Sequence, residues 1–540
     1  MKPAALLLLL LPLSAWAQKT PAPLPADAPL QVARTELQLD PNDDEVLVQP
    51  VPTDTAVVLL VRHPVPNSRK LRYVFQHYGA NLHLRREQDP DVADKWEMPR
   101  LCAEPGVVYA LFQQPGTTGK LLVATYNVRS GQTRTQAFDT KLCRQVLGLK
   151  ALSGQLFVNV TLADAQHQTV LLLDVATGQF QFLPSMYEPL TSELTSVADH
   201  PAGRAEFILT QTNGRKQRLL LKRLSAANHG QLLHSELVQT ESERSLLTAQ
   251  LSPLQDTSAR LLAGTYGLRD THYAQGLFVT DLLAGAGGSS AAELNRRTAL
   301  RFYDFRHLRH FFDYLAPAHS ARLHERSERR AARDASPLHW HYQLLLHEML
   351  PQADGGYTLV AEVYSPVYQY NNYSSPMAGS TLASRGGYGP GGFGPGGYYG
   401  NTYSNGRTLL GVRTSHVVVC GFDKRGNLLW DNTFVVDPDV MRTEVEQAVQ
   451  ALPLADGRLV LAYLLENELH YKLISRDEPG PNDAKVDLQT AGGPGEKVLN
   501  VSQTDIAPWV DNQYVASGFQ RIRAHHGPER QVFFLQLLKF

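Results

Sequence analysis

The chain has 540 residues, of which 43% are hydrophobic, enough to build an extensive buried core. Its 51 lysine and arginine residues balance 52 aspartate and glutamate residues, which leaves a formal net charge of -1. This balance provides no long-range attraction toward nucleic acid, so we expect no nucleic-acid partner.

The N-terminus has the pattern of a secretory signal. Lys2 precedes an apolar run over residues 4–13, and Ala15 and Ala17 form an A-x-A-like cleavage site. The run is shorter than the roughly 20 residues that span a bilayer. We therefore expect residues 1–17 to be a signal peptide, and the protein to be exported to the periplasm, the cell surface or the medium. We expect no transmembrane segment in the mature chain.

Prolines are frequent in the next stretch, residues 18–50, which includes Pro21, Pro23, Pro25 and Pro29. Such a composition favours an extended chain over packed structure. We predict a proline-rich linker over this range.

Short β-branched and aromatic runs alternate with turns from residue 51 to residue 295, which indicates many short strands. Turn glycines between two such runs recur at Gly79, Gly131, Gly178 and Gly230, with spacings of 52, 47 and 52 residues, and more weakly at Gly285. A propeller blade of four strands repeats at about 40–50 residues. We predict an all-β, β-propeller-like fold with about six to seven blades; an array of β-sandwiches is the alternative.

The pattern breaks between residues 296 and 336, where we predict a helical insert. A first helix is predicted over residues 300–315, because Phe302, Phe305, Leu308 and Phe312 recur at three- and four-residue spacings, which is the period of a helix. A second, strongly charged helical stretch follows over residues 320–334.

Further blades are predicted over residues 337–540. They are interrupted at 371–406 by a segment rich in glycine and tyrosine, which we expect to be a disordered loop because its composition cannot form a packed core. The chain ends on an apolar strand over residues 531–540. A terminal strand of this kind often closes a ring by pairing with an early strand, and we predict that it does so here.

Residues 300–540 carry the motif F-D-x-x-G-N-L-L-W-D-N from Phe422 to Asn432, the segment Gly-Phe-Gln-Arg-Ile from Gly518 to Ile522, and the final aromatic strand. In these features the chain resembles uncharacterised exported β-rich proteins of Gram-negative bacteria. The resemblance implies a location in the cell envelope and assigns no catalytic residue.

Local motifs for nucleotide, zinc or nucleophilic chemistry are absent from the sequence, so we predict no catalytic, cofactor-binding or metal-binding residues and no cofactor. His339, His341 and His347 share the parity of one strand face, but 339 and 347 are about 26 Å apart in an extended strand. Cys102 and Cys143 could form a disulfide. Trp430 and Asp431 form the aromatic–carboxylate pair that is common in glycosidases, but we favour a core tryptophan with a turn-facing carboxylate.

Two surface features could bind a partner, an unknown protein or glycan of the envelope. One is an arginine stripe at helical spacing, and the other is the set of aromatic rings in the glycine-rich loop. A solvated helix face and a passive spacer are the respective alternatives. The candidate residues are Arg326, Arg329, Arg330, Arg333, Tyr388, Phe393, Tyr398 and Tyr399. We expect a non-enzymatic envelope scaffold; a polysaccharide or peptide hydrolase or lyase with an axial site, and a structural envelope protein, are the alternatives.

Overall fold

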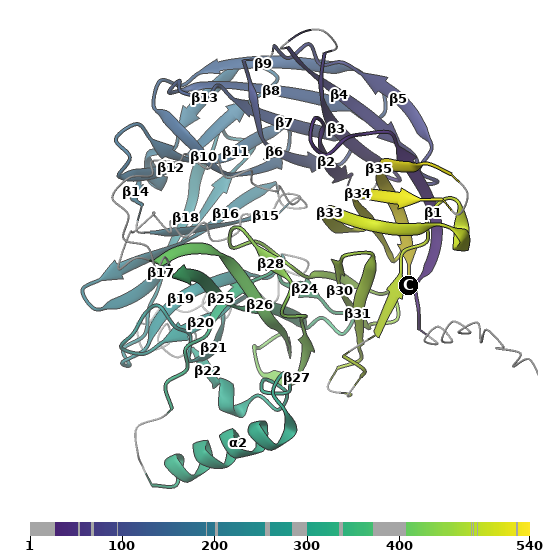
Figure 1. Ribbon diagram of the computed structural model, residues 1–540. Helices are drawn as coiled ribbons and strands as arrows, with labels where there is room; N and C mark the ends of the chain where they lie inside the picture. The colour runs from purple at the N-terminus through teal and green to yellow at the C-terminus, as the bar shows by residue number, and fades with distance from the viewer. Residues whose placement is uncertain are drawn as a thin grey trace, which may run out of the picture.

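The fold repeats one unit, a four-stranded antiparallel sheet, eight times around a ring (Figure 1). This computed structural model describes residues 27–540 except 52–53, 66–67, 69, 94, 191, 200–202, 254–259, 283–299, 334–337, 371–406, 477, 479, 483 and 525–526. The arrangement is an eight-bladed β-propeller, which confirms the predicted fold class but corrects the predicted six to seven blades.

The first four blades follow the chain directly, each as a meander from the innermost to the outermost strand. Blade 1 is β2 (Glu45–Pro50), β3 (Val57–Pro64), β4 (Leu71–Tyr78) and β5 (Leu84–Gln88); blade 2 is β6 (Glu97–Glu104), β7 (Val107–Gln113), β8 (Lys120–Asn127) and β9 (Thr133–Asp139). Blade 3 is β10 (Cys143–Leu152), β11 (Gln155–Leu162), β12 (His167–Asp174) and β13 (Gln179–Phe182), with η1 (Pro184–Met186) and β14 (Glu188–Pro189) attached; blade 4 is β15 (Glu193–Asp199), β16 (Arg204–Asn213), β17 (Lys216–Ser225) and β18 (Gln231–Val238).

The last four blades include the two helical elements and the ring closure. Blade 5 is β19 (Ser245–Leu251), β20 (Leu261–Gly267), β21 (Gly276–Asp281) and β22 (Arg301–Asp304), followed by η3 (Phe305–His307) and α2 (Pro317–Ala331). Blade 6 is β23 (Gln343–Leu346), β25 (Tyr357–Tyr370), β26 (Arg407–Phe422) and β27 (Leu428–Val435), with β24 (Leu350–Pro351) and β28 (Met441–Arg442). Blade 7 is β29 (Gln450–Pro453), β30 (Leu459–Leu465), β31 (Glu468–Ile474) and β32 (Ala484–Asp487); blade 8 is β33 (Lys497–Trp509), β34 (Gln513–Arg523), β35 (Glu529–Lys539) and β1 (Leu30–Leu37), with η4 (Gly493–Gly495) before it.

Alternate residues of one strand enter two different cores, because successive side chains of a strand point to opposite faces. In β3, Val58 and Leu60 pack against blade 2, whereas Val57, Leu59 and Val61 pack against blade 8. The buried apolar residues accordingly form eight clusters, one between each pair of neighbouring blades. Each blade therefore depends on both of its neighbours for the burial of its faces.

Three of the turn glycines predicted from the sequence, Gly131, Gly178 and Gly230, occupy an equivalent position in blades 2 to 4, in the turn just before the outermost strand, whereas Gly79 of blade 1 directly follows β4. Gly131, Gly178 and Gly230 have φ angles of 72°, 74° and 72°. Only glycine adopts this left-handed region without strain, so the repeat in the sequence reflects a repeated turn geometry.

The ring closes in blade 8, where strand β1 from the N-terminal part of the chain pairs antiparallel with β35 at its C-terminal end (Figure 1). The register runs from Leu30 opposite Lys539 to Leu37 opposite Phe533. The predicted closure by residues 531–540 is thus confirmed. The partner strand, however, lies in the range 18–50 that we expected to be a linker, and β2 also lies there. Residues 1–17 lie outside the described part of the chain.

A polar network fastens β1 to the sheet. The guanidinium of Arg34 donates to Gln520 Oε1 at 2.6 Å, to Gln536 Oε1 at 2.9 Å and to Glu36 Oε1 at 2.9 Å. Gln520 and Gln536 are each only 1% exposed. Because these groups are withdrawn from water, each hydrogen bond is needed to offset the cost of burial.

The predicted helix over residues 300–315 is wrong. This segment contains strand β22, the short helix η3 and further turns. Phe305, Leu308, Phe311 and Phe312 are buried, and they belong to the same core cluster as Trp340. Successive turns place these side chains on one side at intervals of three and four residues, which imitates a helical period. The second predicted stretch is helical, as α2.

Removing the Arg34 side chain should destabilise the closed ring. We expect Arg34→Ala to lower the free energy of unfolding by about 3 kcal/mol, because the buried oxygens of Gln520 and Gln536 lose their donor. Urea unfolding measures this change. Arg329→Ala, which removes an exposed helix pair with Glu325, is the matched control and should cost about 0.5 kcal/mol or less. Equal losses in the two variants would contradict the role of Arg34.

Candidate functional site

A cluster of charged side chains gathers on the inner side of the ring, from segments far apart in the sequence. Arg100 lies on β6, Asp505 on β33 and Arg442 on β28, which all lie inside the outer strands (Figure 1). The carboxylate of Glu446 interacts electrostatically with all three of these residues and with Glu444. We call Arg100, Arg442, Glu446 and Asp505 the axial cluster.

A bulge in β33 aims Asp505 into this cluster. The pairing of β33 with β34 shifts register between Ser502 and Asp505, and Gln503 adopts a φ angle of 51°. A bulge of this kind re-directs the following side chain, and it often does so beside functional sites. Asp505 Oδ1 accepts a hydrogen bond from the backbone N–H of Ile506 at 2.9 Å.

The segment that carries Glu446 is fixed at both of its ends. Arg442 pairs with Val412 of β26. The fully buried carboxylate of Glu362 accepts the backbone N–H groups of Ala448 and Val449 at 3.0 Å. Glu446 therefore sits on a constrained connection between blades 6 and 7, which limits the positions that its carboxylate adopts.

Both acids of the axial cluster are harder to ionise than usual. Burial of the carboxyl group raises the pKa of Asp505 to about 6, although Arg442 opposes the shift. Burial and the neighbouring Glu444 raise the pKa of Glu446, although Arg442 and Arg100 lower it. Acids with raised pKa values retain a proton closer to neutral pH, which suits general acid chemistry or ligand binding.

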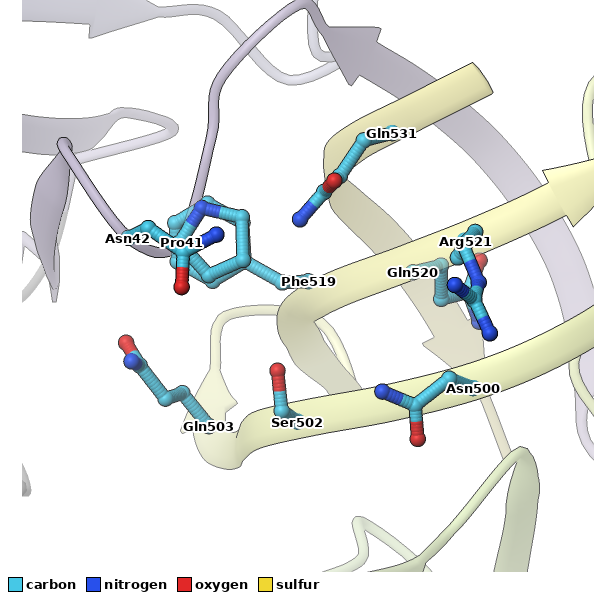
Figure 2. Close-up of a pocket in the computed structure, with 9 residues that line it drawn as sticks. All are labelled: Pro41, Asn42, Asn500, Ser502, Gln503, Phe519, Gln520, Arg521 and Gln531. Atoms are coloured by element: carbon cyan, nitrogen blue, oxygen red, sulfur yellow. The ribbon is translucent and has the colours of Figure 1, made fainter. Parts of the chain in front are cut away.

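A second feature is a polar cleft of about 480 Å³ where blade 8 meets the crossover from β1 to β2 (Figure 2). Its walls come from β33, from β34, from the start of β35 and from the crossover. The lining residues are Pro41, Asn42, Asn500, Ser502, Gln503, Phe519, Gln520, Arg521 and Gln531. The volume lies in the usual range for sites that hold small ligands.

Several polar side chains in the cleft have no protein partner. Asn500, Ser502, Gln503 and Gln531 make no side-chain hydrogen bond to any residue that the structure describes. By contrast, Gln520 bonds to Arg34 and Asn467 behind the cleft wall. The cleft therefore presents free donors and acceptors on a wall that is itself fixed.

The arginine stripe predicted from the sequence lies on the outer helix α2, apart from Arg333 in the turn after it, and away from both features (Figure 1). Arg326, Arg329 and Arg333 are exposed and Arg330 is half-buried. Arg329 donates to Glu325 one helical turn earlier. This arrangement is that of a solvated helix face. Tyr388, Phe393, Tyr398 and Tyr399 lie outside the described residues, between the two strands β25 and β26 of one hairpin.

The histidines considered for metal binding are separated. His347 Nε2 bonds to Glu362 at 2.9 Å inside blade 6, whereas His339 is exposed. Among the described residues, no three histidine, cysteine, aspartate or glutamate side chains are grouped closely enough to hold a metal ion.

Asp431, Cys102 and Cys143 contribute to the stability of the fold. Asp431 accepts the backbone N–H groups of Arg309 at 2.9 Å and His310 at 2.7 Å, so it anchors the turns that follow η3. Cys102 and Cys143 are both free and buried in the core between blades 2 and 3, so the considered disulfide is not formed. Burial raises the pKa of the Cys143 thiol to about 12.

Sequence reasoning missed both features because their residues come from distant segments. The axial cluster draws on positions 100, 442, 446 and 505. One sequence feature does fall at the cleft. The segment Gly518–Ile522, in which the chain resembles exported proteins, contributes Phe519, Gln520 and Arg521 to the lining. Nothing in that segment alone reveals that a cleft forms beside it.

No family model and no curated protein matches this chain. Solved structures resemble it only distantly. A prolyl endopeptidase structure matches with 9% identity and a TM-score of 0.37, covering 89% of this chain and 53% of the other, so the chain spans about half of that protein's length. The β-propeller domain of the trilobed protease from Pyrococcus furiosus matches with 8% identity and a TM-score of 0.32, covering 60% and 82%. Cobalt-substituted apocarotenoid oxygenase from Synechocystis matches with 8% identity and a TM-score of 0.28, covering 44% and 58%. Likeness at this level carries no argument about activity.

The raised pKa of Asp505 gives a testable dependence of stability on pH. Its value of about 6 lies above the ordinary 3.8, so folding loses stability as pH rises through this interval. At pH 8, we expect the free energy of unfolding of Asp505→Asn to be about 2 kcal/mol higher than that of the wild type. At pH 4, we expect no such increase in stability. Denaturant unfolding at both pH values measures the difference. Asp511→Asn, at an exposed turn of the same blade, is the control and should show no such pH-dependent gain.

Proposed function

We propose that this protein is an exported, non-enzymatic scaffold of the cell envelope, whose propeller binds a protein or glycan partner. The observation that carries the proposal is the polar cleft of blade 8, whose free hydrogen-bonding side chains are held on a closed ring. A rigid scaffold that presents uncommitted polar groups binds a ligand at little cost in ordering. Such a site serves recognition without any reacting group.

Export rests on the sequence pattern of the first 17 residues. Among the residues that the structure describes, no helix is both long and apolar enough to cross a bilayer. On the pattern of the first 17 residues, the proposed location is the periplasm, the cell surface or the medium, reached through a cleaved signal, in keeping with the resemblance to exported proteins of Gram-negative bacteria.

The scaffold proposal predicts saturable binding to envelope material without turnover. The full-length protein, expressed in a Gram-negative host, should be recovered outside the cytoplasm with Gln18 at its N-terminus. The purified protein should then co-sediment with isolated cell envelopes, reach saturation, and leave the envelope components chemically unchanged. Recovery in the cytoplasm would refute export, and the absence of saturable sedimentation would refute the scaffold.

The axial cluster favours a second candidate, a hydrolase acting on a polysaccharide or peptide. Asp505 on β33 and Glu446 on the connection between blades 6 and 7 are two acids with raised pKa values, and paired carboxyl groups are the usual acid and base of glycoside hydrolysis. Arg100 and Arg442 lie beside them and make the cluster mixed in charge.

The two candidates are separated by assaying release of new reducing ends and new amines from envelope polysaccharide and peptide fractions. The hydrolase candidate predicts release that falls by at least about 100-fold in both Asp505→Asn and Glu446→Gln, the usual contribution of a general acid or base. Thr443→Ala, an exposed substitution in the same segment, is the control. No release by the wild-type protein would leave the scaffold as the function.

A further inference from the structure

We propose that the cleft of blade 8 binds a saccharide, with the amide and hydroxyl side chains holding its hydroxyl groups and Arg521 holding the carboxylate of an acidic sugar. This inference rests on the proposed binding function and names the ligand class of that same site. The inference rests on a row of hydrogen-bonding side chains that lies across three adjacent strands.

The strand register places these side chains in line. Asn500 of β33 lies opposite Arg521 of β34, which in turn lies opposite Gln531 of β35. Adjacent strands are about 4.8 Å apart, so the row extends over about 10 Å. Ser502, opposite Phe519, continues the same face one step along the strands. Figure 2 shows these side chains around the cleft, with Asn42 and Gln503 at one end.

The chemistry of the lining fits a polyhydroxylated ligand. Asparagine and glutamine each offer two donors and one acceptor oxygen, and a serine hydroxyl both donates and accepts. Sugar hydroxyls have the same dual character, so every contact can be satisfied. The single aromatic ring in the lining, Phe519, is only 2% exposed, so the cleft offers little apolar wall to a hydrophobic ligand.

Charge in the cleft selects for a neutral or acidic ligand. The lining contains one arginine and no aspartate or glutamate. Arg521 is exposed, and its nearest carboxylate contact is Glu529 at 3.9 Å, beyond hydrogen-bond distance. Glu529 makes a closer pair with Arg523. The guanidinium of Arg521 is thus available for the bidentate pairing that it makes with carboxylates.

The wall behind these side chains is fixed before any ligand arrives. Gln520 is tied to Arg34 and Asn467, and the Phe519 ring packs edge-on against Phe533 with their centroids 5.0 Å apart. On the crossover, the carboxylate of Asp40 accepts from both the backbone and the side chain of Asn42. A site ordered in advance loses less entropy on binding, which raises affinity.

The test measures binding of defined oligosaccharides to the full-length mature protein by titration calorimetry. Pentamers of glucose and of galacturonic acid are the probes. We expect both to bind, with the uronic acid pentamer tighter. The double variant Asn500→Ala/Gln531→Ala should weaken binding of both pentamers by about tenfold or more, since each lost hydrogen bond costs roughly a factor of three to ten.

Arg521→Ala should abolish the preference for the uronic acid pentamer and leave binding of the glucose pentamer within about twofold. Arg72→Ala is the control, because Arg72 is about as exposed, with 54% of its side chain accessible against 55% for Arg521, and lies on another blade, where it pairs with Asp89. Gln179→Ala, on the exposed outermost strand of blade 3, is the control for the amides. Both controls should bind as the wild type does.

Failure of this inference is distinguishable from failure of the proposed function. If neither pentamer binds while the protein still sediments with envelopes, the saccharide assignment is wrong and the scaffold stands. If the pentamers bind but the cleft variants behave as their controls do, the site lies elsewhere and the inference is overturned. Unaltered unfolding curves confirm that the exposed substitutions leave the fold intact.

Discussion

Each sheet of this protein is apolar on both faces, and the rest of the structure depends on this constraint. A four-stranded sheet with two apolar faces is stable only when a neighbour covers each face. Placing eight such sheets in a row would leave one face uncovered at either end. The ring removes both ends, and the eight interblade clusters are the result. The outer faces of the first and last blades are therefore buried only when the ring is closed.

The closure itself relies on polar contacts as well as apolar ones. Strand β1 is half-exposed along most of its length, so apolar burial alone specifies its position weakly. Arg34 supplies the specificity, because its three acceptors, on Glu36, Gln520 and Gln536, coincide only in one register. Arg530 adds a second tie by pairing with Glu36 and Glu496, and this pairing lowers the pKa of Glu496 to about 2. A slip of one residue would send Arg34 to the opposite face.

The sequence predicts the blades where one sheet is one continuous segment with a glycine turn before its outermost strand. It undercounts them where that condition fails. Blade 6 is divided by residues 371–406, and blade 8 is assembled from the two ends of the chain. Strand β1 escaped prediction because Arg34 and Glu36 occupy the positions where alternation would place apolar residues. After residue 300 the error was a predicted helix that does not form, because turns fixed by Asp431 give the apolar residues the spacing of a helix.

The candidate sites could not be predicted from the sequence, because their residues meet only after the ring has closed. The segment Gly518–Ile522 illustrates why. Alternation sends Gln520 toward Arg34 and the ring closure, while Phe519 and Arg521 face the cleft and the crossover. Reading the segment without its partners, one cannot separate these two roles. The bulge at Gln503 divides β33 in the same way, since Gln503 lines the cleft and Asp505 enters the axial cluster.

Closure and ligand binding are consequently coupled through one blade. A ligand in the cleft would contact Asn42, on the crossover from β1 to β2, and Gln531, at the start of β35. These two contacts coexist only when β1 and β35 are paired. A ligand that binds only the closed ring stabilises it by mass action, by RT ln(1 + [L]/Kd). Recognition at this site would therefore reinforce the same strand pairing on which the burial of all eight blades depends.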